Sequence, residues 1–133
     1  MTSINNSNSS TLIEKNLFEY FLGLVGQIKL YHWSTMSYSN HKALDDLHES
    51  LSNNIDEIIE IYIGKYNKQP IENFEINMKA NTDTNDIIGY LATEREKIRG
   101  IRNKYFKGCT EIQNLFDNIL GSMSKTIYLC KLK

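Results

Sequence analysis

Apolar residues recur three and four positions apart in four separate stretches of this chain, at residues 12–31, 44–62, 87–105 and 112–130. That interval is the spacing of one face of an α-helix, so each stretch predicts an amphipathic helix with one buried side. No stretch shows the alternation of apolar and polar residues that would indicate a half-buried strand. The sequence therefore predicts an all-α fold in which the four helices pack as a bundle.

Residues that can cap a helix precede the second and the third stretch. Ser39 or Asn40 is predicted to be the N-cap of the second helix, and Asp83 or Thr84 that of the third. Their side-chain oxygens can accept a hydrogen bond from a free backbone N–H group in the first turn.

The segment between the second and third helices is polar and holds the only proline, Pro70. We expect the second helix to stop at Gly64, which leaves residues 65–83 to connect the two helices. That is long for a plain loop, so a short helix near residues 71–78 is predicted within it.

Composition limits the class of protein. The chain has 133 residues, of which 41% are hydrophobic and 23% charged, and its formal net charge is −1, values typical of one globular domain. Residues 1–10 are rich in Asn and Ser and are predicted to be a disordered N-terminal tail, which leaves residues 11–133 as the domain. No apolar run could cross a membrane and no signal peptide is recognisable, so we expect a cytoplasmic protein. Cys109 and Cys130 are expected to be buried thiols.

Four side chains of metal-binding type share one flank of the second helix. At ~100° per residue, His41, Asp45, Asp56 and Glu60 fall within about 100° of one another, beside the predicted core face. Most amphipathic helices carry acids on such a flank, so this pattern alone favours an ordinary solvated face.

The spacing along the helix adds a second constraint. Asp45 and Asp56 are eleven residues apart, which is ~16 Å at the helical rise, so the two pairs cannot bind one ion within one chain. Two copies of the helix packed antiparallel about a two-fold axis would bring the His41/Asp45 end of one to the Asp56/Glu60 end of the other. Imidazole and carboxylate together suit iron, manganese or zinc rather than calcium.

These residues, with the His32-Trp33 dipeptide before them, resemble the ferroxidase signature of Dps proteins, the DNA-protecting miniferritins of the ferritin-like superfamily. The similarity lies in HW, then H-x3-D, then D-x3-E eleven residues after the first Asp. By motif it covers the first two helices, and by architecture the whole bundle. It implies a ferritin-like four-helix bundle with an iron site between two subunits. One subunit would supply three ligands and its mate two: His32, His41 and Asp45 from one, Asp56 and Glu60 from the other.

The resemblance also implies an activity. A mono-iron or di-iron centre would oxidise ferrous iron with hydrogen peroxide, or more slowly with dioxygen, and Trp33 would intercept oxidising equivalents. The ferric product would be stored in a hollow, dodecameric homo-oligomer. DNA binding in that family relies on a lysine-rich tail, and here the first basic side chain is Lys15, so DNA binding is not expected.

Two other interpretations remain open from the sequence. The segments LYHWST and SNHKA also resemble uncharacterised ferritin-like proteins of giant viruses. That resemblance implies a virion-associated protein. Such a protein could keep the bundle as a non-catalytic structural element. A binding module that holds zinc or manganese is the third interpretation. His48 lies on the same flank and is expected to be solvated, with an accessory metal contact as the alternative.

Overall fold

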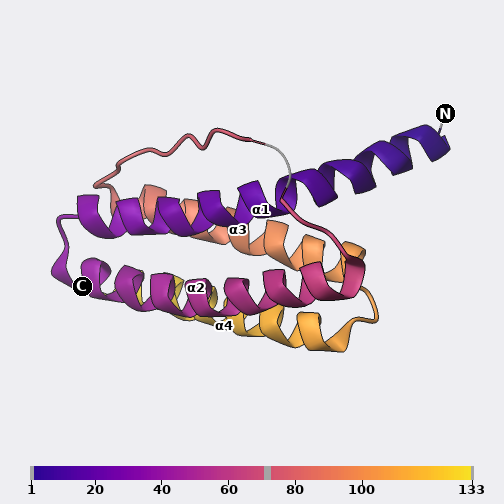
Figure 1. The fold of residues 1–133 in the computed structure, drawn as a ribbon. Coiled ribbons are helices and arrows are strands. Elements are labelled where there is room, and N and C mark those ends of the chain that lie inside the picture. The colour runs from indigo at the N-terminus through magenta and orange to yellow at the C-terminus, as the bar shows by residue number, and fades with distance from the viewer. Residues whose placement is uncertain (1, 71–72, 133) are drawn as a thin grey trace.

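A computed structural model describes residues 2–70 and 73–132, and within them it contains four α-helices and no β-strand (Figure 1). The helices are α1 (Thr2–Ser34), α2 (Tyr38–Tyr66), α3 (Thr84–Tyr105) and α4 (Thr110–Lys131). Helix α2 packs against α1 and α4, and α4 packs against α3. The predicted all-α four-helix bundle is confirmed.

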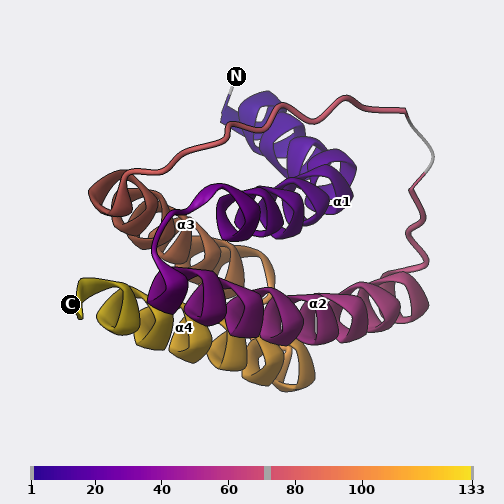
Figure 2. The same cartoon turned by 90° about the vertical axis from the view of Figure 1, so that its left-hand side faces the viewer.

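The order of the helices leaves one long crossover. Short turns join α1 to α2 and α3 to α4, whereas the connection from α2 to α3 runs back along the bundle (Figures 1 and 2). Helices α2 and α3 therefore start at the same end of the bundle and run parallel. This arrangement makes α1 and α2 one antiparallel hairpin, and α3 and α4 another.

The rotation of α2 follows from its apolar stripe. All six residues predicted to form the stripe are buried: Leu44, Leu47, Leu51, Ile55, Ile58 and Tyr62. They enter one continuous core in which the rings of Phe21 on α1 and Phe116 on α4 lie 6.0 Å apart. Burying an aliphatic side chain of this size stabilises the fold by ~1.5–3 kcal/mol, so the stripe fixes which flank of α2 remains at the surface.

The caps of the two central helices differ in how well the sequence predicts them. Asp83 caps α3 as expected, because its carboxylate accepts the backbone N–H of Asp86 at 3.0 Å. The prediction of Ser39 or Asn40 as the N-cap of α2 is wrong. The cap is Ser37, whose hydroxyl accepts the N–H of Asn40 at 3.3 Å. Asn40 is buried instead and donates its side-chain amide to Thr84 at 2.9 Å, which ties the start of α2 to the start of α3.

The prediction of a short helix within the crossover is also wrong for those of its residues that the structure describes. Residues 73–83 contain no helix, and residues 71–72 lie outside the described residues. The physical reason is an anchor on α1: the buried Gln27 side chain donates to the Lys79 carbonyl at 2.8 Å and accepts the Lys79 N–H at 3.0 Å. Because Gln27 takes backbone groups that a helix would pair internally, this part of the crossover stays extended across α1.

Two glycines on different helices offer a matched test of how closely the crossover packs. A Cβ at Gly26 of α1 would lie 2.8 Å from the Met78 sulfur, whereas one at Gly100 of α3 would meet nothing within 4 Å. We expect Gly100→Ala to raise the free energy of unfolding by roughly 0.5–1 kcal/mol, because alanine favours a helix interior over glycine. Gly26→Ala should gain less or lose stability, since Met78 must move. Urea unfolding of both variants checks this, and equal gains would show that Met78 does not pack on α1.

Helix α1 continues to Thr2, and its first turns project beyond the bundle (Figure 1). The disorder of residues 1–10 in solution stays a prediction. Among the described residues, no helix is both long enough and apolar enough to cross a membrane.

Candidate metal centre

The short turn between α1 and α2 stacks two histidines on each other. The ring centroids of His32, at the end of α1, and His41, at the start of α2, are 3.9 Å apart and their planes meet at 20°. Each ring bonds the backbone of the other residue: His32 Nδ1 lies 2.6 Å from the His41 carbonyl oxygen, and His41 Nδ1 lies 2.8 Å from the His32 carbonyl oxygen. The pair thus fastens the two helices together.

These reciprocal contacts define the tautomer of both rings. A carbonyl oxygen can only accept a hydrogen bond, so each Nδ1 must carry a proton and donate it. In the neutral form of such a ring, the lone pair is on Nε2. Metal-binding histidines are commonly held in this way, with Nδ1–H on a carbonyl and Nε2 free for the metal.

Asp45 joins the histidine pair from the next turn of α2. Its Oδ1 lies 3.7 Å from His32 Nε2, the ring nitrogen that does not contact the His41 carbonyl. His32 is buried, with 7% of its surface exposed, whereas the Asp45 side chain is 56% exposed. An imidazole nitrogen and a carboxylate oxygen therefore converge at the surface.

Lys29 was not predicted to belong to the site. Its Nζ lies 3.5 Å from the same Asp45 oxygen and 6.0 Å from the centre of the Trp33 ring. Trp33 is 68% exposed on this side of α1. The helical spacing carries a usable signal, because Lys29 precedes His32 by three residues and Trp33 by four, which places all three on one face.

Two further aromatic groups border the pair. The Tyr38 ring stacks on His41 with centroids 6.4 Å apart. His48 is half-buried, and burial lowers its pKa, as do the positive charge of Lys29 and the nearby His32, while Asp45 opposes them. His48 thus faces the same small cluster.

The remaining predicted ligands form a second, separate group. Asp56 and Glu60 are both exposed further along α2, about 16 Å and about 22 Å from Asp45 by the helical rise. Within the part of the chain that the structure describes, no three His, Cys, Asp or Glu side chains are placed to hold one metal ion. Within one chain, His32, His41 and Asp45 lie near one another without forming such a group, and Asp56 and Glu60 lie further along α2.

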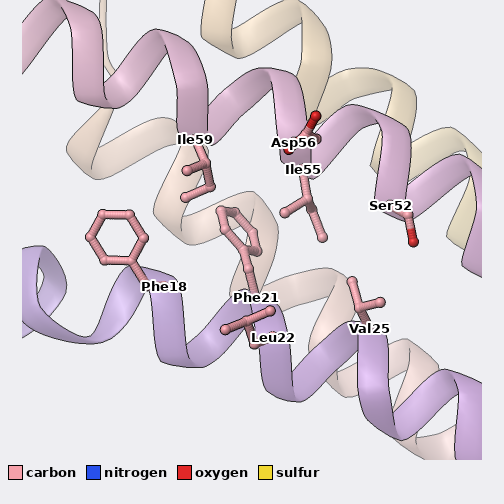
Figure 3. Close-up of a pocket in the computed structure, with 8 residues that line it drawn as sticks. All are labelled: Phe18, Phe21, Leu22, Val25, Ser52, Ile55, Asp56 and Ile59. Carbon is pink, nitrogen blue, oxygen red and sulfur yellow. The ribbon is translucent and has the colours of Figure 1, made fainter. Parts of the chain in front are cut away.

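An apolar groove of about 350 Å³ lies between α1 and α2, bordered by Asp56 (Figure 3). Its floor and walls are mostly aliphatic and aromatic side chains: Phe18, Phe21, Leu22 and Val25 from α1, and Ile55 and Ile59 from α2, with Ser52 beside Asp56. Leu22 is 56% exposed at the edge of this groove. The face of the α1–α2 hairpin thus carries histidines near one end and carboxylates further along, with an apolar patch beside the carboxylates.

The sequence matches the profile of DUF5856, described as a family of unknown function, over residues 32–130. The chain belongs to the DUF5856 family. The region shared with DUF5856 starts at His32 and includes every residue of the predicted site. The chain is also 28% identical, over 117 residues, to an uncharacterized 14.6 kDa protein in the mobD-ri intergenic region of Enterobacteria phage T4, covering 85% of this chain and 87% of the phage protein. No solved structure matches the chain.

Proposed function

We propose that this protein binds and oxidises ferrous iron at a site shared by two subunits, and stores the ferric product, as a miniferritin of the Dps type. The observation that carries the proposal is the histidine pair. Each imidazole has its Nδ1 atom engaged by a backbone carbonyl, which leaves Nε2 to face outward, and the Nε2 of His32 lies 3.7 Å from the Asp45 carboxylate. The donor set of imidazole and carboxylate suits iron.

The topology supports the proposal. Four-helix bundles with one long crossover include the ferritin-like proteins, which build metal sites from inward or interfacial carboxylates and histidines. Here the crossover joins α2 to α3 and is anchored on α1 by Gln27. A shared fold does not establish an activity, so the proposed function depends on the site residues.

The placement of the two ligand groups supports a two-fold dimer. His41 and Glu60, and likewise Asp45 and Asp56, are equidistant from the midpoint between Ser50 and Leu51. A two-fold axis at that point pairs the histidine end of one α2 with the carboxylate end of the other, and it does so twice. The same axis brings the positive Lys29 near the partner's carboxylate end, which favours association.

The apolar groove supplies the contact that such a dimer needs. A second copy laid antiparallel over the α1–α2 face would cover Leu22 and the side chains around Ile59, which a monomer leaves in water. Burial of that surface stabilises the dimer, while the polar ends set its register. A closed shell of dimers remains part of the proposal, since the ferric product needs an enclosed space.

The proposed reaction takes iron as its substrate. Two ferrous ions, one hydrogen peroxide and two water molecules give two FeO(OH) units and four protons, so peroxide is reduced to the oxidation level of water. In this scheme His32 and His41 bind through Nε2, the carboxylates neutralise the metal charge, and Trp33 lies within reach of stray oxidising equivalents. Lys29 must release the Asp45 oxygen for that carboxylate to bind iron.

A stopped-flow measurement tests the proposal. Metal-free protein is loaded with ferrous iron without oxygen and mixed with a small excess of peroxide, while the ferric absorbance is followed. We expect a fast, saturable rise that reaches a plateau at one or two irons per subunit. A rate equal to that of iron in buffer would contradict the proposal.

A second candidate is a dimer that holds zinc or manganese without turnover. The Lys29–Asp45 ion pair favours it, because it occupies one carboxylate oxygen that a second metal would need. Tight zinc binding by calorimetry, without accelerated iron oxidation, would support this candidate instead. In either case the phage relative supports a viral setting, so we expect the protein in the cytoplasm of an infected cell or in the virion.

A further inference from the structure

The end of α2 lies beside the start of α4 (Figure 1). Four titratable side chains meet there. Lys65 and Tyr66 come from α2, and Cys109 and Glu111 come from the N-terminus of α4. Lys65 lies 24 residues after His41 on the same helix, which is about 36 Å at the helical rise. The cluster is therefore separate from the candidate metal centre.

The lysine amine bridges the thiol and the carboxylate. Lys65 Nζ lies 3.5 Å from Cys109 Sγ and 2.6 Å from Glu111 Oε1. The hydrogen bond to Glu111, and then that to Cys109, raises the pKa of Lys65, while the bond from Lys65 lowers the pKa of Glu111 to about 2. A charged amine is thus held against the sulfur.

Cys109 also occupies the N-cap position of α4 and is 4% exposed. Thiols beside a cation and at a helix N-terminus are those that react as thiolates. The Tyr66 phenol borders the same sulfur; burial, and then Cys109, raises its pKa. The amine, half exposed at 45%, gives the cluster an open side toward solvent.

The second cysteine is a natural control. Cys130 is 3% exposed in the core at the other end of α4, and burial raises the pKa of its thiol. Buried thiols in apolar surroundings are chemically inert.

We propose that peroxide converts the Lys65–Cys109 contact into a covalent sulfenamide bond between Nζ and Sγ, which cross-links α2 to α4. The thiolate attacks peroxide, its sulfur gains one oxygen, and hydroxide leaves, giving a sulfenic acid. The exposed amine loses one proton to water and attacks sulfur. The S–O bond then breaks, and the leaving hydroxide takes a second proton from the nitrogen and departs as water. In sum, one thiol, one amine and one hydrogen peroxide give one sulfenamide and two waters.

The cross-link would hold together residues 44 positions apart and span the whole crossover. Closing a loop of that length restricts the unfolded chain, so the oxidised protein should melt at a higher temperature. The inference is independent of the proposed iron chemistry, because it needs only the chain and peroxide.

Mass spectrometry of the metal-free, full-length protein after peroxide treatment tests the proposal. A sulfenamide makes the chain lighter by two hydrogen atoms and blocks tryptic cleavage after Lys65. We expect a peptide of residues 43–68 joined to residues 108–125. Dithiothreitol should release the two peptides, and the Tm of the oxidised protein should fall back by several degrees on the same treatment.

Three variants keep the test sharp. Cys130→Ser should give the cross-link in full, whereas Cys109→Ser and Lys65→Arg should give none; arginine keeps the charge beside Glu111. Circular dichroism of each variant confirms that it is folded. Cys109 carried to the sulfinic acid without any joined peptide, or equal loss of two hydrogens in Lys65→Arg, would overturn the proposal. A disulfide between two chains is distinguished by its doubled mass.

Discussion

Replacement of Asp56 by alanine is expected to abolish rapid oxidation of ferrous iron while leaving the subunit folded. Asp56 is exposed on α2 and belongs to no core contact, so its loss should not destabilise the bundle. Loss of one carboxylate ligand should lower the rate by at least the roughly 10–100-fold that loss of a supporting residue causes at metal sites. Asp46→Ala is the matched control, because Asp46 is also exposed on α2 but is not one of the predicted ligands. Stopped-flow absorbance measures both.

Mixing two inactive variants separates an intersubunit site from one within the chain. His41→Ala and Asp56→Ala, each refolded alone, lack a complete site. Refolded together in equal amounts, about a quarter of all sites should combine an intact histidine end with an intact carboxylate end, because a two-fold dimer holds two equivalent sites. Recovery of that fraction of the wild-type rate is the expected result. No recovery, with mixed dimers demonstrated, would place the reaction elsewhere.

Introducing a charge at Leu22 is expected to separate the dimer. Leu22 is 56% exposed on α1 at the edge of the apolar groove, and a two-fold interface contains it twice. Each leucine side chain contributes ~1.5–3 kcal/mol on burial, so losing two of them should weaken the dimer by more than about 100-fold. Analytical ultracentrifugation of Leu22→Asp should therefore show monomer at concentrations where the wild type is dimeric.

Tyr128→Asp is the control for this experiment. Tyr128 is 59% exposed, but it lies on α4 and does not line the groove. We expect it to leave the dimer intact. A dimeric Leu22→Asp protein that still oxidises iron would mean that the two copies meet through another face, and the proposed geometry would have to be abandoned.

The parts of the fold that could be predicted are those that depend on local periodicity. The buried stripe of α2, from Leu44 to Tyr62, could be predicted because an amphipathic helix must place its apolar residues on one side. The N-cap at Asp83 is legible for the same local reason. Both depend only on residues a few positions apart.

The parts that could not be predicted depend on contacts between distant segments. The crossover stays extended because Gln27 binds Lys79, 52 residues later, and no window of the sequence reveals that bond. Ser37 rather than Ser39 caps α2, and Asn40 bonds through its side chain to Thr84, 44 residues later. Tertiary contacts here outweigh local preference.

The candidate site could likewise be predicted only in part. His32, His41 and Asp45 could be named from spacing and resemblance, but their arrangement could not. The stacking of His32 on His41 depends on a turn of three residues that brings two helix ends into register. The Lys29 ion pair with Asp45 likewise depends on how α1 and α2 pack, although the sequence shows that Lys29 shares a helix face with His32.

All the side chains of the proposed iron site lie on the α1–α2 hairpin, whereas α3 and α4 give the core apolar residues such as Ile98 and Phe116. The first hairpin is therefore constrained by the proposed ligands and the second by core packing. At the apolar core positions of the second hairpin, other apolar side chains of fitting volume can serve, because packing tolerates exchange when volume is kept. In the first hairpin, exchange of one proposed ligand for another residue type is expected to end iron oxidation. Under the proposed function, the apolar core positions of α3 and α4 can therefore diverge further than the ligand positions of the α1–α2 hairpin.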